Sequence, residues 1–227
     1  MASQTFRKDR PTTILLIRHG LTPTTGTILP GRAPGLHLSS GGEVQAEGVA
    51  DRISALGKPE RASGRSSQTP PVAIYASPLE RATETAKPIA RRLGLRVRTD
   101  RGLTECDFGE WTGSRLSQLA KKPSWAQVQR HPSGFRFPGG ESFLEMQSRM
   151  VETVGHLVDR HPGAIIVAVS HADPIKAAVA AAAGIHLDLF QRLVVQPCSV
   201  SAITHTEGGP HVLCVNSTTS LTELAIA

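Results

Sequence analysis

Short apolar runs alternate along this chain with longer segments in which apolar residues recur every three or four positions. Short β-branched runs predict buried strands, and a spacing of three or four predicts amphipathic helices. The predicted strands lie at 12–17, 72–76, 95–98, 164–169, 199–206 and 211–216. The predicted helices lie at 40–56, 79–93, 142–157 and 174–184. This alternation predicts an α/β fold, a three-layer sandwich in which helices flank a mostly parallel central sheet.

Capping signals mark where three of these helices begin. Ser40-x-x-Glu43 and Ser142-x-x-Glu145 each have the pattern of a capping box, in which a serine hydroxyl and a glutamate satisfy free backbone N–H groups. Ser77 precedes a proline and is followed three residues later by Glu80. That order predicts an N-cap serine with proline at the first helical position.

Three segments lack a clear period. Residues 21–38 form a Gly/Pro-rich loop of a length that is usually functional, and residues 57–71 form a polar stretch that we expect to be a mobile surface loop. Residues 102–138 are predicted to be irregular apart from one short helix after Ser114. Since one core can serve 227 residues, we expect a single domain over 12–227 after a flexible N-terminal tail over 1–11.

The charge pattern favours an anionic partner. Lys and Arg number 25 against 19 acidic residues, and 19 of the 25 are Arg, whose planar fork matches phosphate and carboxylate oxygens. The excess is concentrated between 52 and 65 and at Arg91, Arg92, Arg96, Arg98 and Arg101. Aromatic residues make up only 4% of the chain and do not interleave with these clusters, which disfavours a base-stacking platform for nucleic acid.

Cysteine usage and hydropathy favour a reducing, cytoplasmic setting. The three cysteines, Cys106, Cys198 and Cys214, are odd in number and have no C-x-x-C spacing. No apolar run approaches the length of a membrane span, and the run at 14–17 is too short for the core of a signal peptide. The histidines show no spacing typical of metal ligands on a common face, so we expect neither a metal nor another cofactor.

Two predicted strands end in histidine. The first leads into Arg18-His19 and the second into Ser170-His171, while Arg81 follows a third strand in the first turn of its helix. Ligands of open parallel sheets bind beyond the carboxyl ends of the strands, so these side chains should meet at one edge. Their positive charge and their N–H donors suit a phosphoryl group.

Glu105 lies in a glycine-punctuated loop, Gly102-Leu-Thr-Glu-Cys-Asp-Phe-Gly-Glu-Trp-Thr-Gly113. Such a loop either carries the carboxyl group over a phosphate site or lets it pair with a nearby arginine. The nearby positive charges of Arg18 and Arg81 would lower the pKa of His19 and keep its imidazole neutral.

Five motifs in order resemble the histidine phosphatase superfamily, which contains the cofactor-dependent phosphoglycerate mutases and many phosphatases. They are Arg18-His19-Gly20, Ser77-Pro-Leu-x-Arg81-Ala-x-x-Thr-Ala86, Glu105-x-x-x-Gly109-x-x-x-Gly113, Gly139-Gly-Glu-Ser142 and Ser170-His171. The resemblance covers about residues 12–216 and implies a phosphoglycerate mutase-like fold.

The resemblance also implies roles. His19 would be the nucleophile, Arg18, Arg81 and His171 would hold the phosphoryl group, and Glu105 would protonate the leaving oxygen. Thr22 matches a position that often supplies a hydroxyl to the phosphate. Thr25 matches a further phosphate-binding position, where the family commonly has an asparagine, and Ala172 stands where glycine is frequent.

The leading interpretation is a metal-independent phosphomonoesterase of the histidine acid phosphatase type, which acts on a small phosphorylated metabolite through phosphohistidine. A phosphoglycerate mutase-type phosphomutase is the nearest alternative. Mutases of this family carry a longer insertion with adjacent arginines after the Glu105 loop, whereas residues 107–138 here contain Lys121-Lys122 and no Arg-Arg pair. The alternative from another class is a non-catalytic binder of phosphorylated ligands or nucleic acid.

Substrate identity stays open at this level. Arg32, Arg130 and Arg136 are each candidates to bind a second anion of the substrate, with Arg32 and Arg136 preferred. The expected partner is a small phosphorylated substrate, with no nucleic acid and no membrane. The oligomeric state is open, with a homodimer as one option.

Overall fold

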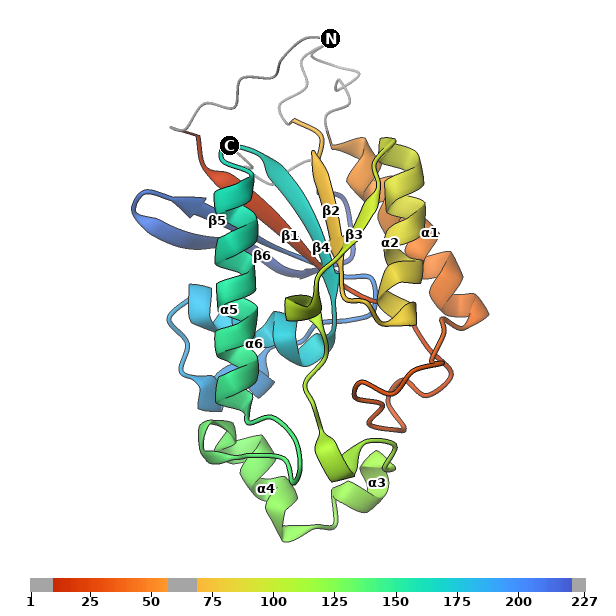
Figure 1. Ribbon diagram of the computed structural model, residues 1–227, viewed down its shortest axis with the longest axis vertical. Helices are drawn as coiled ribbons and strands as arrows, with labels where there is room; N and C mark the ends of the chain where they lie inside the picture. Colours follow the sequence, from red (N-terminus) through yellow and green to blue (C-terminus); the bar gives the residue numbers. More distant parts are fainter. Residues whose placement is uncertain (1–9, 57–68, 222–227) are drawn as a thin grey trace.

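A mixed β-sheet forms the centre of the molecule (Figure 1). The computed structural model describes residues 10–56 and 69–221. The strands within these ranges are β1 (Thr12–Arg18), β2 (Ala73–Ala76), β3 (Val97–Thr99), β4 (Ile165–Ser170), β5 (Val200–Thr206) and β6 (Gly209–Ser217). Their order is β3-β2-β4-β1-β5-β6, with the first four parallel and β5 and β6 antiparallel at one edge. The predicted mostly parallel sheet is confirmed.

Helices cover both faces of the sheet. On one face lie α1 (Ser40–Ala55) and α2 (Glu80–Leu93), and on the other α5 (Phe143–Arg160) and α6 (Ala172–Ala182) (Figure 1). In β1, Leu15 and Ile17 join the core beneath α1 and α2, whereas Ile14 and Leu16 join the core beneath α5 and α6. Successive side chains of a strand point to opposite faces, so an uninterrupted apolar run is required here. The three-layer sandwich is confirmed.

Aromatic side chains build a third core at the end of the molecule where the parallel strands finish. It contains Phe108, Trp111, Phe135, Phe137, Phe143 and Phe190. The chain around it forms η1 (Arg101–Leu103), η2 (Gly109–Trp111), α3 (Leu116–Leu119), α4 (Pro123–Arg130) and η3 (Pro132–Gly134), and α3 and α4 lie below the sheet in Figure 1.

The predicted short helix after Ser114 is present as α3, whereas α4 lies in a stretch that was predicted to be irregular. In α4 only Val128 is fully buried, so the helix leaves no apolar period in the sequence. Its local signal is Pro123 at the first helical position, where the missing N–H costs nothing. The packing of Trp125 near Trp111 attaches α4 to the aromatic core.

The capping predictions have different outcomes. The box at the start of α5 is confirmed, because Ser142 Oγ accepts a hydrogen bond from Glu145 N at 3.2 Å and the Glu145 carboxylate accepts one from Ser142 N at 2.9 Å. Helix α1 is capped one residue earlier than predicted, by Ser39. Helix α2 begins at Glu80 without any side-chain cap, so the predicted N-cap role of Ser77 is wrong.

Two predicted segments fall largely beyond the described ranges. Residues 1–9 of the expected N-terminal tail and residues 57–68 of the expected surface loop lie outside the described residues. In the two described ranges, every helix is too short or too polar to cross a lipid bilayer.

Two glycines bring the start of α1 against the chain that leaves β1. A Cβ at Gly42 would lie 2.0 Å from the carbonyl oxygen of Leu21, and a Cβ at Gly20 would lie 2.6 Å from the carbonyl oxygen of Gly42. Leu21 O also accepts a hydrogen bond from Ser39 N at 2.9 Å. The close approach fixes the backbone directly after the first strand-end histidine.

Gly42→Ala should destabilise the protein by about 1–3 kcal/mol, since backbone meets backbone and neither can move aside cheaply. Gly48→Ala is the matched control in the same helix, because nothing lies within 4 Å of its added Cβ. Gly48→Ala should raise the free energy of unfolding by about 0.5–1 kcal/mol through helix propensity. Urea unfolding measures both, and shifts of the same sign would contradict the close approach.

Candidate active site

Strand register places the two strand-end histidines side by side. Arg18 of β1 pairs with Ser170 of β4 in the parallel ladder, and His19 N donates a hydrogen bond to Ser170 O at 3.0 Å. The following residues, His19 and His171, lie with ring centroids 5.1 Å apart and ring planes at 60°. Neighbouring parallel strands thus join two residues that are far apart in the sequence.

Two guanidinium groups, one fully buried and one half-buried, lie beside this pair. Arg81, in the first turn of α2, is fully buried, and its Nη2 donates to the carbonyl oxygen of Gly31 at 2.8 Å. Arg18 Nη1 donates to the carbonyl oxygen of Val195 at 2.7 Å. At this site, four buried nitrogens have no hydrogen-bond partner among the described residues: Arg18 Nε, Arg81 Nε, Arg81 Nη1 and His171 Nδ1. A buried unpaired donor costs about 1–3 kcal/mol, so this group calls for an anion.

A hydrogen bond from the His19 ring to the backbone leaves one ring nitrogen, Nε2, free. Its Nδ1 lies 2.8 Å from the carbonyl oxygen of Gly20, and because a carbonyl only accepts, Nδ1 carries the hydrogen and Nε2 the lone pair. Burial, with Arg81 and Arg18 adding to it, lowers the pKa of His19 to about 3, although the Gly20 carbonyl opposes this. The imidazole is therefore neutral at physiological pH.

Glu105 has the opposite titration behaviour. The side chain is buried, and its Oε1 accepts a hydrogen bond from Cys106 N at 2.9 Å. Burial and the nearby Asp173 raise the pKa of Glu105 to about 7, against the opposing effects of Arg81, the Cys106 N–H and Arg18. A carboxyl group with this pKa can give or take a proton near neutral pH.

A salt-bridged network holds the backbone that carries Glu105. Arg32 Nε donates to the carbonyl oxygen of Glu105 at 2.8 Å, and Arg149 Nη1 donates to the carbonyl oxygen of Thr104 at 2.9 Å. Both arginines pair with the Glu141 carboxylate, at 2.8 Å and 2.9 Å. Arg32 thus already has a carboxylate partner, and its expected contact with a second substrate anion stays a prediction.

The threonines of the loop after β1 bond to each other. Thr25 Oγ1 lies 2.9 Å from Thr22 Oγ1 and accepts a hydrogen bond from Thr22 N at 2.9 Å. Thr22 is buried and follows His19 closely in the sequence, and its hydrogen bond to the Thr25 hydroxyl stabilises the turn between them. Arg136, in contrast, pairs with Glu145 at the start of α5 and donates to Gly140 O at 3.0 Å. These contacts do not join Arg136 to the histidine cluster.

The amino-acid sequence that forms this site matches a known protein family. The sequence model of the histidine phosphatase superfamily (branch 1) matches residues 14–218. The chain belongs to this superfamily. The resemblance drawn from the motifs is confirmed, whereas the finer expectation of a histidine acid phosphatase type stays a prediction.

Several proteins are similar to this chain in sequence. The chain is 32% identical over 218 residues to the bifunctional protein Rv2228c of Mycobacterium tuberculosis, covering 94% of this chain and 56% of that protein. It therefore spans about half the length of the relatives it matches with the widest coverage. It is 30% identical over 155 residues to phosphoserine phosphatase 1 of Hydrogenobacter thermophilus, which covers 67% of this chain and 74% of that enzyme.

Solved superfamily structures show the same fold. The mycobacterial glucosyl-3-phosphoglycerate phosphatase Rv2419c aligns with a TM-score of 0.78 and 25% identity, over 92% of this chain and 100% of that one. A phosphoserine phosphatase variant from Entamoeba histolytica, in complex with phosphoserine, aligns with a TM-score of 0.79 and 25% identity, over 92% and 99%.

Sequence reasoning missed several residues around the site. Arg149 gave no signal, because a single arginine among apolar positions of α5 reads as solvent-exposed. The sequence pattern does not place Asp173 near Glu105, since only the fold brings α6 to that loop. The sequence predicts a helix-capping role for Ser77, but its Oγ lies 2.9 Å from His171 Nε2.

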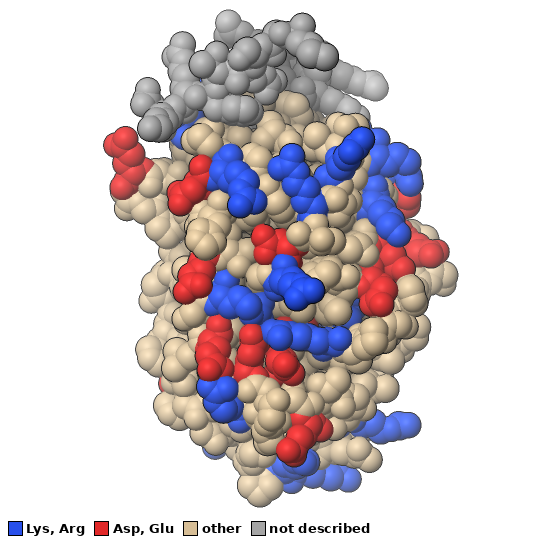
Figure 2. All heavy atoms as spheres, in the orientation of Figure 1, with Lys and Arg blue, Asp and Glu red and all other residues tan. Residues whose placement is uncertain are grey.

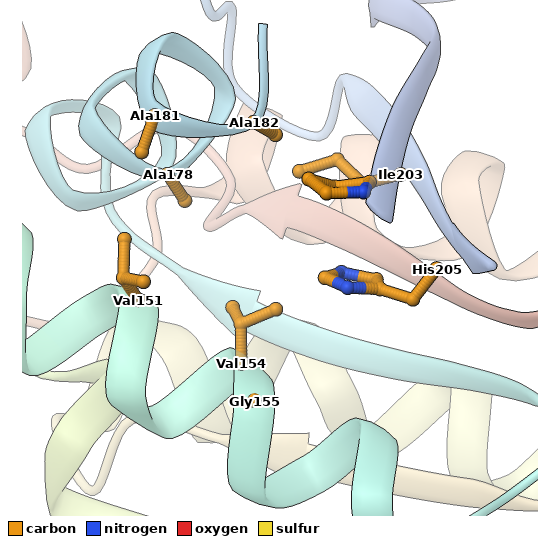
Figure 3. Close-up of a pocket in the computed structure, with 9 residues that line it drawn as sticks. Val151, Val154, Gly155, Ala178, Ala181, Ala182, Ile203 and His205 are labelled. Carbon is orange, nitrogen blue, oxygen red and sulfur yellow. The ribbon is translucent and has the colours of Figure 1, made fainter. Parts of the chain in front are cut away.

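A hollow elsewhere in the molecule has a different character. It measures about 270 Å³, lies between α5, α6 and the strand β5, and is apolar except for His205 (Figure 3). None of the candidate site residues lines it. Across residues 10–56 and 69–221, no group of three or more His, Cys, Asp or Glu side chains is arranged to hold a metal ion.

Basic side chains on the surface are interspersed with acidic ones. On the face shown in Figure 2, Lys and Arg alternate with Asp and Glu. Within one of the predicted basic clusters, Arg91 pairs with Glu47, and Arg92 pairs with both Glu47 and Asp51. This pairing weakens the case for that cluster as a surface for nucleic acid, which requires uncompensated positive charge.

The low pKa of His19 should appear as a pH-dependent stability difference. As pH falls from 6.5 towards 3, unfolded His19 binds a proton that the folded imidazole refuses, so the wild type loses stability. In His19→Gln this loss is absent. The free energy of unfolding of the variant, relative to the wild type, should therefore rise by up to ~1.4 kcal/mol for each unit by which the pH falls. Glu105, whose shift has the opposite sign, is present in both proteins and cancels in the difference.

Urea unfolding between about pH 4 and pH 7 at constant ionic strength measures this difference. The exposed His156→Gln variant controls for the substitution itself. A gap between wild type and His19→Gln that stays constant over this range would contradict a neutral, buried His19.

Proposed function

We propose that this chain hydrolyses the phosphomonoester of a small phosphorylated metabolite through a phosphohistidine intermediate on His19. One observation carries the proposal. The Nε2 lone pair belongs to a buried, neutral imidazole, and the neighbouring buried groups present N–H donors that have no acceptor. A neutral nucleophile beside arginine and histidine N–H groups that lack an acceptor suits the transfer of an anionic phosphoryl group.

Binding comes first. The phosphoryl oxygens accept hydrogen bonds from the free N–H groups of Arg18 and Arg81 and from Nδ1–H of His171. The guanidinium groups supply the positive charge that the transferring group needs, so the chain's own residues neutralise it. The phosphate dianion raises the pKa of Glu105 further, which keeps that carboxyl protonated for the next step.

Phosphoryl transfer follows. The Nε2 lone pair of His19 attacks phosphorus, the ester P–O bond breaks, and Glu105 gives its proton to the leaving oxygen. The hydrogen on Nδ1 stays bonded to the Gly20 carbonyl, which stabilises the positive charge that develops on the ring.

Hydrolysis completes the cycle. Glu105, now a carboxylate, takes a proton from water as the water oxygen attacks phosphorus. The N–P bond breaks, and its electron pair returns to Nε2 as the lone pair. Inorganic phosphate then leaves, and Glu105 is protonated again. The network of Arg32, Arg149 and Glu141 holds the Glu105 backbone in place through both half-reactions.

The substrate class follows the relatives in coarse terms. Two similar proteins are named phosphatases of phosphoserine and of glucosyl-3-phosphoglycerate, both small phosphorylated metabolites. The buried donor set recognises the phosphoryl group itself. The rest of the substrate would meet the loop after β1 and the segment 107–138.

Phosphomutase activity is the second candidate. The chain is 29% identical over 197 residues to the probable phosphoglycerate mutase GpmB of Cronobacter sakazakii. In the segment 107–138, however, Lys122 lies over the ring of Trp111, and no adjacent arginines are present to bind a substrate carboxylate. We favour the phosphatase. Interconversion of 2- and 3-phosphoglycerate that outruns phosphate release, with a bisphosphoglycerate primer present, would favour the mutase.

His19→Ala should reduce turnover by roughly 10³-fold or more while the protein stays folded, because only binding and charge stabilisation remain. The wild type, quenched after mixing with a radiolabelled phosphomonoester, should yield an acid-labile, base-stable phosphoprotein. The variant should yield none, and His156→Ala serves as the control. Retained turnover in His19→Ala would overturn the proposal.

Glu105→Gln should slow hydrolysis of alkyl phosphates far more than that of p-nitrophenyl phosphate. An alkoxide needs a proton in order to leave, whereas p-nitrophenolate is stable as the anion, and general acid catalysis is worth ~10²- to 10⁴-fold. Single-turnover phosphorylation of His19 is the cleanest readout, because Glu105 also acts in the second step. The exposed Glu110→Gln variant is the control, and equal losses for both substrates in Glu105→Gln would reject Glu105 as the acid.

A further inference from the structure

Ser77 lies at the junction between β2 and α2, and its hydroxyl bonds to the histidine that follows another strand. The residue is fully buried, and its Oγ lies 2.9 Å from Nε2 of His171. The N–H of Leu79 donates to the same oxygen at 3.4 Å. Since α2 starts at Glu80 with no side-chain cap, helix capping does not account for the hydroxyl.

The hydroxyl has one hydrogen, and only one acceptor is available for it. Leu79 N–H can only donate, so it uses an oxygen lone pair of Ser77. If His171 Nε2 also donated, the hydroxyl hydrogen would be buried without an acceptor, since Ser77 Oγ has no third partner in the described residues. The favourable arrangement has Ser77 Oγ–H donating to Nε2, which leaves the ring hydrogen on Nδ1.

Nδ1 of His171 belongs to the unfilled donor group. It is buried without a partner, as are Arg18 Nε, Arg81 Nε and Arg81 Nη1. With hydrogen on Nδ1, all four nitrogens donate, which suits the oxygens of one anion. In the other tautomer, the ring would direct a lone pair towards that anion and repel it.

Only a neutral ring has two tautomers to choose between. Burial, with Arg81, His19 and Arg18 adding to it, holds the pKa of His171 well below its usual range, so the ring is neutral before the substrate binds. The two strand-end histidines therefore carry their hydrogen on the same atom for different purposes. His19 directs its Nδ1–H to the Gly20 carbonyl and keeps Nε2 free, whereas His171 accepts at Nε2 and keeps its Nδ1–H free.

We propose that Ser77 is a positioning residue that fixes His171 as the Nδ1–H tautomer, so that His171 donates a hydrogen bond to the phosphoryl oxygen. The anion is taken to be a phosphoryl group, and to this extent the inference builds on the proposed function. Ser77 touches no reacting atom and acts through the imidazole alone.

The test is the ring ¹⁵N chemical shifts of His171 in the full chain without ligand, recorded with long-range ¹H–¹⁵N correlation between about pH 5.5 and pH 8. The wild type should show a protonated Nδ1 and an unprotonated Nε2. Ser77→Ala should shift these signals towards a mixture of tautomers and weaken the binding of inorganic phosphate by ~10- to 100-fold, the worth of a hydrogen bond to a charged group. Ser77→Thr, which keeps the hydroxyl, should restore both. Ser54→Ala, at a half-buried serine of α1 outside the site, is the control.

A wild-type His171 with its hydrogen on Nε2 would overturn the proposal without any variant. Unchanged ring shifts and unchanged phosphate affinity in a folded Ser77→Ala would do the same. This result is separable from the fate of the proposed function. If the tautomer and phosphate affinity respond as expected but no phosphohistidine is trapped, the positioning role of Ser77 stands and the proposed hydrolysis fails.

Discussion

The fold concentrates buried N–H donors that lack an acceptor at one point, and the rest of the site is organised around this imbalance. Arg18, Arg81 and His171 together leave four nitrogens unpartnered in the described part of the chain. Moving a charge out of water costs several kcal/mol, and two like charges side by side add repulsion. Such an arrangement is tolerated where an anion compensates it. After burial, which is the largest cause, the charges of Arg81 and Arg18 also help to keep His19 neutral, as the proposed nucleophile must be. One electrostatic feature thus supports both phosphate binding and the activation of the nucleophile.

Parallel strand register is what makes the imbalance possible. Because β1 and β4 are hydrogen-bonded neighbours, their carboxyl ends deliver two histidines to the same place, while β2 delivers Ser77 and Arg81 next to them. The close contact at Gly42 fixes the backbone after His19, and the Arg32–Glu141–Arg149 network fixes the backbone of Glu105. Rigid elements therefore hold both the proposed nucleophile and the proposed acid, a carboxyl group whose pKa of about 7 suits proton transfer in either direction.

Much of this was predictable from the sequence, and the failures have physical reasons. The strands and long helices left strong periods because each buries one or two faces, and His19 and His171 could be placed because they directly follow apolar runs. The short α4 buries only one residue fully and left no period. The wrong caps at Ser40 and Ser77 arose because a serine hydroxyl has several possible partners. Only the tertiary structure shows that Ser77 bonds to a histidine 94 residues away.

The central claim is that the free donors form one phosphoryl site opposite Nε2 of His19. A crystal structure of this chain with orthovanadate tests it most directly, because vanadate adopts the five-coordinate geometry of a phosphoryl group in transfer. The account predicts vanadium bonded to Nε2 of His19, with its oxygens on the guanidinium groups of Arg18 and Arg81 and on Nδ1 of His171. Vanadate bound elsewhere, or seated in the pocket with Nε2 turned away and Nδ1 of His171 unpaired, would contradict the account.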